Sequence, residues 1–259
     1  MINSYGILGI SLDDKNRPAL YTNQIDVTLG DSGQVVLWSL SHDWKSVWKN
    51  SACSFYLISV TLLPFGSILG ISNDPANEDI YELWLAINYK VDSLEWVKIE
   101  YVTLPSQVGL RSVTIMNDRT MLAVGADNQL YTCSSYPQNQ AIWEFIQIEG
   151  SGNPGCITVL QDGKICCNWE PDGFTGLRVT DPPPAKTDWV DQGQGLLYSL
   201  AMNDLSVTQD GSILGVSKNS VSSGTNLYAT SQSFANEWSQ VSGGETRQLI
   251  SAWACWALP

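Results

Sequence analysis

The chain has 259 residues, 44% of them hydrophobic, and carries 26 acidic against 13 basic residues, a formal net charge of −13. This charge, with the basic residues scattered along the chain, argues against nucleic acids and anionic membranes as partners, because both are bound through basic patches. No apolar stretch is long enough for membrane insertion and no basic-then-apolar leader is visible at the start, so we expect a cytoplasmic protein or one released by a non-classical route.

The first predicted strand covers residues 7–11, and the same short β-rich segment recurs at 68–72, 121–125, 165–168 and 213–217. In each of the later copies, a β-rich run precedes this segment, and two more strand signals follow it. Four short strands in one period of about 45–50 residues are typical of a β-propeller blade. The sequence therefore predicts a propeller built from repeated four-stranded antiparallel sheets.

A tryptophan in the predicted fourth strand keeps the register of the repeat. Successive copies are separated by 52, 47, 46 and 49 residues, and these copies are Trp44, Trp96, Trp143, Trp189 and Trp238. The first repeat lacks a first strand, whereas residues 249–253 at the other end of the chain resemble residues 57–61. We therefore expect one all-β domain over residues 1–259, a five-bladed β-propeller in which N- and C-terminal strands close one blade.

Turn and packing residues recur in phase with these strands. Asn and Asp tolerate tight turns, and Gly accepts positive φ. We expect such turns between the first two strands at residues 117–118, 162–163 and 210–211. Small side chains at equivalent second-strand positions would let neighbouring blades approach closely, and these are Gly70, Ala123, Cys166 and Gly215.

Metal and redox sites are not expected. The chain has six cysteines without a CxxC pair and one histidine, His42, so neither a zinc site nor a histidine-based catalytic triad is recognisable. Free cysteine is commonly a small buried hydrophobe, which we expect for most of these residues, with one or two disulfides as the alternative. No cofactor is predicted.

Glycoside hydrolysis is the enzymatic alternative, and it needs carboxylates that converge at the mouth of the central channel. The segments expected to be innermost contain neither Asp nor Glu; they are residues 57–61, 111–115, 157–161, 205–209 and 249–253. The recurring turn aspartates resemble one another, whereas a catalytic acid and base must differ. We therefore expect a protein that is not an enzyme.

The clearest copy of the repeat is formed by residues 205–217, 226–228 and 238–243, and weaker copies span nearly the whole chain. This repeat resembles that of the tectonin family of β-propeller lectins, with tachylectin-like five-bladed lectins as structural relatives. Trp84 and Arg178 depart from the pattern, since they stand where the third strand has a tyrosine in other copies. The resemblance implies that sugars bind in several equivalent shallow pockets, one per blade or between neighbouring blades.

Sugar rings have an apolar face bordered by hydroxyls, so a binding site needs an exposed aromatic ring beside hydrogen-bonding side chains. The chain has 11 tryptophans, several of them next to Asp or Glu. The predicted glycan-binding residues are Trp96, Trp143, Trp189, Trp238, Asp188, Asn236, Glu237, Asn168 and Trp169. An equally open alternative is that the recurring tryptophans seal one blade against the next.

These observations favour a lectin that recognises glycans or glycoconjugates by multivalency. A millimolar monosaccharide site contributes only about −4 kcal/mol. Several such sites that engage one clustered glycan raise the apparent affinity on the order of 10²–10⁴-fold. The first alternative is a protein-interaction propeller without sugar specificity, because propellers carry unrelated functions on one fold. A propeller glycosidase is the second.

Overall fold

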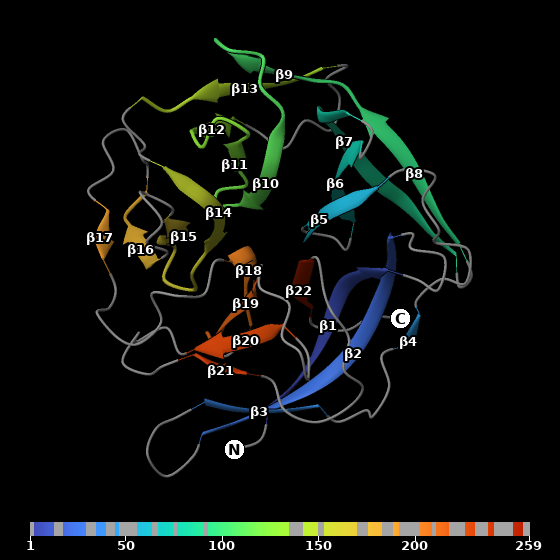
Figure 1. Ribbon diagram of the computed structural model, residues 1–259, viewed down its shortest axis with the longest axis vertical. Coiled ribbons are helices and arrows are strands. Elements are labelled where there is room, and N and C mark those ends of the chain that lie inside the picture. The colour runs from blue at the N-terminus through green and yellow to red at the C-terminus, as the bar shows by residue number, and fades with distance from the viewer. Residues whose placement is uncertain are drawn as a thin grey trace.

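The regular structure of the described chain consists of β-strands (Figure 1). The computed structural model describes residues 3–12, 18–29, 35–39, 45–46, 56–63, 67–74, 77–90, 93–134, 142–149, 153–169, 176–182, 189–191, 202–208, 211–217, 226–230, 238–240 and 251–255. Among these residues, no helix is long and apolar enough to cross a membrane. The predicted all-β class is confirmed.

The described strands form five sheets, each named below from its innermost strand outwards. The first contains β22 (Ser251–Cys255), β1 (Asn3–Leu12), β2 (Pro18–Leu29) and β3 (Val35–Ser39), with β4 (Lys45–Ser46) also paired to β2. The second contains β5 (Leu57–Leu62), β6 (Ile68–Asp74), β7 (Asn77–Lys90) and β8 (Ser93–Ile99). The third contains β10 (Leu110–Ile115), β11 (Met121–Gly125), β12 (Leu130–Cys133), β13 (Trp143–Gln147) and β9 (Tyr101–Leu104).

The remaining two sheets have four strands each. The fourth contains β14 (Pro154–Val159), β15 (Ile165–Trp169), β16 (Gly176–Thr180) and β17 (Val190–Asp191). The fifth contains β18 (Met202–Val207), β19 (Ile213–Ser217), β20 (Leu227–Thr230) and β21 (Ser239–Gln240).

The sheets are arranged around a common centre, with one first strand of each sheet innermost (Figure 1). These inner strands contact one another in cyclic order, from β5 to β10, β14, β18 and β22, and from β22 back to β5. Strand β22 also pairs with β1, from Gly6 opposite Cys255 to Ile10 opposite Ser251. Both ends of the described chain therefore lie in one sheet, with the last strand shifted by two residues from the predicted 249–253.

A β-bulge recurs near the start of the innermost strand, and the sequence gives no direct signal for it. The register shifts between Leu57 and Ser59 in the second sheet, and at the matching place in the third, fourth and fifth sheets. A bulge bends its strand and increases the local twist. Beyond it, each of these four strands places three consecutive buried residues against its neighbours.

The tryptophan of the fourth strand packs against a small residue of the second strand. A Cβ on Gly70 would lie 3.0 Å from Cζ3 of Trp96, and a Cβ on Gly215 would lie 2.9 Å from Cη2 of Trp238. The strand pairing corrects one predicted equivalence: Ile157 lies opposite Cys167, as Val60 lies opposite Gly70. The residue equivalent to Gly70 is therefore Cys167 and not Cys166.

Two of the aspartates predicted between the first two strands, Asp118 and Asp162, form turns as predicted, and Asp210 lies outside the described residues. The Thr120 amide donates to Oδ1 of Asp118 over 2.8 Å, and the Lys164 amide donates to Oδ1 of Asp162 over 3.1 Å. Gly163 next to Asp162 has a φ of 87°, a conformation that costs glycine little. These carboxylates are occupied by local backbone bonds, which is the structural role that their symmetry indicated.

The cysteines whose side chains are described are buried thiols, namely Cys133, Cys156, Cys166 and Cys167. Burial raises the pKa of the Cys166 thiol from 9.0 to about 12 and also raises the pKa of Cys167 well above its ordinary value. Cys53 lies outside the described residues, and so does the side chain of Cys255. For the described cysteines, the expectation of small buried hydrophobes is confirmed.

Thiol burial predicts a loss of stability at alkaline pH. Above pH 9 the unfolded thiols lose their protons while the folded Cys166 keeps its own until about pH 12, so the unfolded state binds fewer protons. The free energy of unfolding should therefore be unaffected by these thiols below pH 9 and fall between pH 9 and 12. Urea titrations of the wild type and a Cys166→Ala variant measure this; equal slopes against pH in that range would contradict it.

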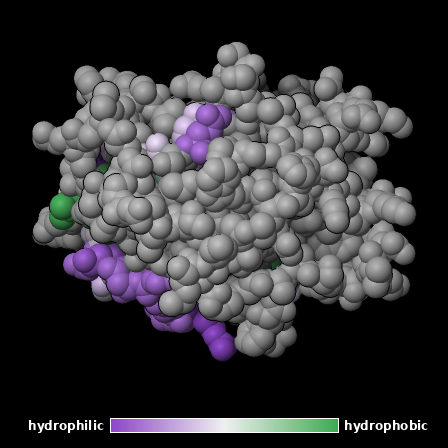
Figure 2. All heavy atoms as spheres, turned by 90° about the horizontal axis from the view of Figure 1, so that it is seen from below, coloured by the Kyte–Doolittle hydropathy of each residue, from purple (hydrophilic) through white to green (hydrophobic). Residues whose placement is uncertain are grey.

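Figure 2 shows the molecule from below, where the described surface is mostly hydrophilic with one small hydrophobic spot at its edge. The described part of this side therefore presents little apolar area.

Candidate functional site

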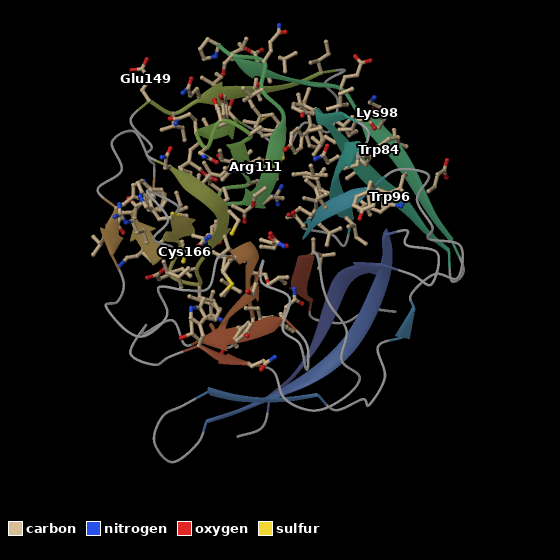
Figure 3. All side chains as sticks on the ribbon, in the orientation of Figure 1. Trp84, Trp96, Lys98, Arg111, Glu149 and Cys166 are labelled. Atoms are coloured by element: carbon tan, nitrogen blue, oxygen red, sulfur yellow. The ribbon has the colours of Figure 1, made fainter. Side chains whose placement is uncertain are left out.

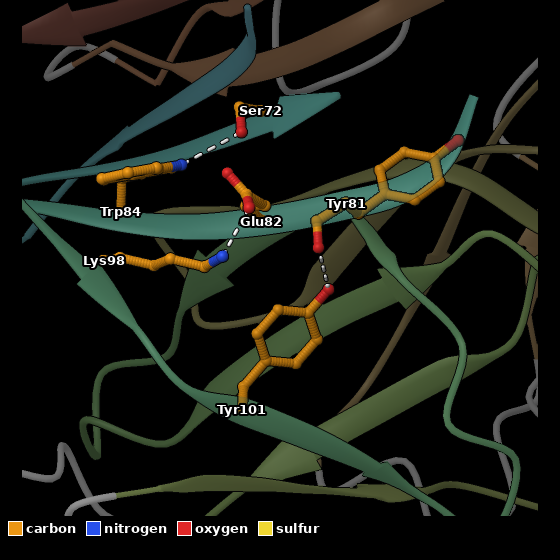
Figure 4. Close-up of polar contacts among 6 residues, drawn as sticks. All are labelled: Ser72, Tyr81, Glu82, Trp84, Lys98 and Tyr101. Carbon is orange, nitrogen blue, oxygen red and sulfur yellow. Dashed lines mark hydrogen bonds and ion pairs between the residues drawn. The ribbon is translucent and has the colours of Figure 1, made fainter. Parts of the chain in front are cut away.

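A groove of about 560 Å³ opens where the second and third sheets meet at the outer edge of the molecule. Its walls come from the start of β7, the end of β8, strand β9, the loop before β10 and the residue before β13. The lining residues are Ile80, Tyr81, Glu82, Lys98, Ile99, Glu100, Tyr101, Val102, Thr103, Gln107, Val108, Gly109 and Ile142. Figures 3 and 4 show this part of the molecule with its side chains.

The groove exists because the chain changes sheets between β8 and β9. Strand β8 is the outer strand of the second sheet, whereas β9 pairs in parallel with β13 of the third sheet, with Tyr101 opposite Trp143. The carbonyl of Glu100, between these strands, accepts a hydrogen bond from the Trp143 amide over 2.8 Å. One continuous segment thus bridges two sheets and leaves a hollow behind it.

Tyr101 fixes the two walls relative to each other. Its hydroxyl donates to the Tyr81 carbonyl over 3.1 Å (Figure 4) and accepts a hydrogen bond from the Leu110 amide over 3.2 Å. Its ring meets Phe145 edge to face, with centroids 6.2 Å apart. Burial raises the pKa of Tyr101 above 10.0, the bond from Leu110 lowers it by a smaller amount, and the hydroxyl is therefore a neutral donor at physiological pH.

The loop before β10 forms the floor of the groove. A Cβ on Gly109 would lie 2.2 Å from Cδ2 of Tyr81, so only glycine lets this ring rest on the backbone. The Gln107 amide donates to the Thr103 carbonyl over 2.7 Å, and Oγ1 of Thr103 donates to the Val108 carbonyl over 2.7 Å. These bonds hold the loop against β9, which makes the groove a pre-formed site.

The groove combines aromatic, aliphatic and polar surface. Glu82 and Lys98 form an ion pair on one wall (Figure 4), and Glu100 adds an exposed carboxylate. Ile80 and Ile142 at the rim are 43% and 47% exposed. Such a lining can hold an apolar ring face while hydrogen-bonding its polar rim, which is the requirement of a polyhydroxylated ligand.

None of the four described recurring tryptophans lines this groove, and Trp44 lies outside the described residues. Trp143 is 4% exposed and belongs to the core between the second and third sheets. Trp189 is partly buried against the core between the third and fourth sheets, and Trp238 against the core between the fourth and fifth. Trp96 is also partly buried, over Gly70 of its own sheet. The positions of Trp143, Trp189 and Trp238 fit the sealing alternative, and the Trp143 ring has no face open to a ligand.

The suspected pair Asn168 and Trp169 is also buried. Asn168 is 2% exposed, and its side-chain amide donates to the Met202 carbonyl over 3.4 Å. Trp169 is 9% exposed, and its ring centroid lies 5.6 Å from that of Trp189. The guanidinium carbon of Arg178 lies over the Trp169 ring, 4.4 Å from its centroid. The cation–π stack explains why an arginine replaces tyrosine in this strand. Asp188, Asn236 and Glu237 lie outside the described residues.

One inner strand contains an aspartate, which corrects a sequence-based expectation. Strand β18 begins at Met202, three residues before the predicted start, and includes Asp204. This side chain is 3% exposed and accepts a hydrogen bond from the Leu205 amide over 3.0 Å. A second carboxylate is not found on the other described inner strands β5, β10 and β14. Within the described residues, no group of three or more His, Cys, Asp or Glu could hold a metal ion.

Sequence reasoning missed every residue of the groove. A signal was nevertheless present: residues 101–104 form a β-rich run between the tryptophan of one repeat and the first strand of the next, which the four-strand pattern does not require. Tyr81 lies in another irregularity, the 14-residue strand β7. The groove residues therefore lie where the sequence departs from the repeat, whereas the residues that recur in the repeat lie mostly in the core.

Comparison with solved structures identifies the fold as a β-propeller. A chain in a crystal structure of a nidogen/laminin complex is similar over 97% of this chain and 98% of its own length, with a TM-score of 0.52 and 9% identity. TolB from Acinetobacter baumannii is similar over 96% of this chain and 66% of its own length, with a TM-score of 0.51 and 12% identity. Neither is a tectonin or a tachylectin-like lectin, and at this identity the likeness shows the fold alone. No family model and no curated protein sequence matches the chain.

Proposed function

We propose that this chain is a closed five-bladed β-propeller that binds carbohydrate without turning it over. The blade number and the closure are supported by the five sheets, the cyclic contacts of the inner strands and the pairing of β22 with β1. A closed propeller offers its central channel, its outer edge and the spaces between blades to ligands.

The observation that carries sugar binding is the groove between the second and third sheets. Its volume of about 560 Å³ lies within the range of small-ligand sites, and its lining pairs Tyr81 and Tyr101 with Glu82, Lys98 and Gln107. The preformed walls lower the entropy lost when a ligand is held. A neutral sugar suits this site, because the carboxylate of Glu82 already engages the only ammonium of the lining.

Further weak sites at the repeat positions are part of this proposal. Trp96, Trp189 and Trp238 are half-buried and keep some surface beside their sheets, with Asp188, Asn236 and Glu237 as their polar neighbours in sequence. Sites of this kind would add avidity on clustered glycans and little affinity for a single sugar.

A glycan array followed by calorimetric titration tests the proposal. Replacing Glu82 with alanine should weaken binding of the best array ligand by about tenfold or more, because a hydrogen bond to a charged group contributes roughly 1.5–3 kcal/mol. The melting temperature should hardly change, since an exposed ion pair adds about 0–1 kcal/mol to stability.

Glu149→Ala is the matched control, because Glu149 is an exposed carboxylate outside the groove (Figure 3). It should bind like the wild type. An array without any ligand, or equal affinities of the two variants, would refute the groove as a sugar site.

A further inference from the structure

A second surface, outside the groove's interior, lies on the outward face of strands β9 and β13. Trp143 and Phe145 of β13 point into the core, so the alternate residues Glu144 and Ile146 point outwards. In the parallel pairing, Glu144 lies opposite Val102 and Ile146 lies opposite Leu104. Ile146 is 53% and Leu104 is 39% exposed, so two aliphatic side chains stand side by side in solvent.

This face is exposed because the third sheet is wider than its neighbour. Nearer the centre, the same sheet buries Leu122 and Ile148 against the fourth sheet. The fourth sheet ends in β17, a strand of two residues, whereas the third continues through β13 to a fifth strand, β9. Figure 1 shows β9 and β13 at the rim, and the exposure of Leu104 and Ile146 agrees with a face that the described strands of the fourth sheet do not cover.

Part of the edge of β9 is already occupied by a loop. The outward carbonyl of Thr103 accepts the Gln107 amide, and the loop between them is held against the strand. A partner therefore contacts the side chains of this face and does not extend the sheet, because natural sheets protect such edges with loops.

The negative charge of this face indicates which kind of protein segment can bind to it. The outward rows place the exposed carboxylate of Glu144 beside the aliphatic residues, and neither β9 nor β13 contains a basic residue. A second copy would bring Glu144 near its own counterpart, in a chain with a net charge of −13. Like charges at a contact are unfavourable, whereas Lys or Arg opposite them is favourable.

We propose that the outward face of β9 and β13 docks a segment of a different protein in which aliphatic side chains alternate with Lys or Arg. The aliphatic pair Leu104 and Ile146 forms the centre of the contact, and Glu144 sets the charge preference. Leu104 and Ile146 do not line the groove, whereas Val102 of the same outward row does, so the two surfaces adjoin and the contact centre lies outside the sugar site.

The test uses two synthetic peptides, one of alternating leucine and lysine and one of alternating leucine and glutamate, at physiological ionic strength. The full chain should bind the lysine peptide and not the glutamate peptide. A Leu104→Ser/Ile146→Ser variant should lose about tenfold or more in affinity, as central apolar contacts do. Glu144→Lys should weaken the lysine peptide and gain binding of the glutamate peptide.

Asp181→Lys is the control, because it makes the same change of net charge at an exposed carboxylate outside this face. It should leave the preference for the lysine peptide unchanged. This control distinguishes recognition at the proposed face from a general attraction between a cationic peptide and an acidic protein. Equal binding by the wild type and the double serine variant would overturn the proposal. So would a concentration-dependent dimer in sedimentation that the double variant abolishes, since the occupant would then be a second copy. Glycan titration of the same variants should match the wild type.

Discussion

Deletion of residues 249–259 should abolish cooperative unfolding and leave an aggregating chain. Strand β22 pairs with β1 on one side and contacts the inner strands β18 and β5 of two neighbouring sheets. Its loss would break the cycle of inner strands, expose the edge of β1 and leave the apolar flanks of both neighbours in water. Because whole domains are stable by only about 5–15 kcal/mol, the loss of a central strand exceeds what the rest can offset.

Calorimetry and light scattering on the purified truncated chain measure this effect. Removal of residues 256–259 alone is the matched control, because it retains β22, and this shorter truncation should melt close to the full chain. A truncation from residue 249 that melts like the full chain would show that β22 is dispensable and that the ring of sheets does not depend on both termini.

Replacement of Trp143 by alanine should lower the free energy of unfolding by about 3–5 kcal/mol, the cost of truncating a large core side chain. Trp143 is 4% exposed and packs in the core with Phe145 between the second and third sheets. Binding of any glycan per folded molecule should remain unchanged, because the ring has no surface to offer.

The control stands three residues away in the same strand. Ile146 is 53% exposed, so Ile146→Ala should change stability by less than about 0.5 kcal/mol. Chemical denaturation of both variants, with glycan titration at a temperature where both are folded, measures the difference. Normal stability of the Trp143 variant together with lost sugar binding would restore this tryptophan as a ligand contact.

Features that depend on local chemistry could be predicted from the sequence alone. The second-strand segments 121–125 and 213–217 were predicted with the bounds that β11 and β19 have, because strand pattern and turn residues act over a few neighbours. The turn role of Asp118 and Asp162 followed from their symmetry in the repeat for the same reason. The strand at the far end of the chain was also recognisable, since it copied a first strand that the N-terminal repeat lacked.

The candidate site was decided by tertiary structure. Strand β9 pairs with β13, about forty residues later in the chain, and no local pattern specifies a parallel partner at that separation. The sequence pattern of a tryptophan beside an acidic residue is the same whether the ring faces a ligand or a neighbouring sheet. The packing of the sheets is what buries Trp143 and leaves Ile146 exposed to solvent. The groove arose in the same way, because its walls are residues from two sheets that become neighbours only when the chain folds.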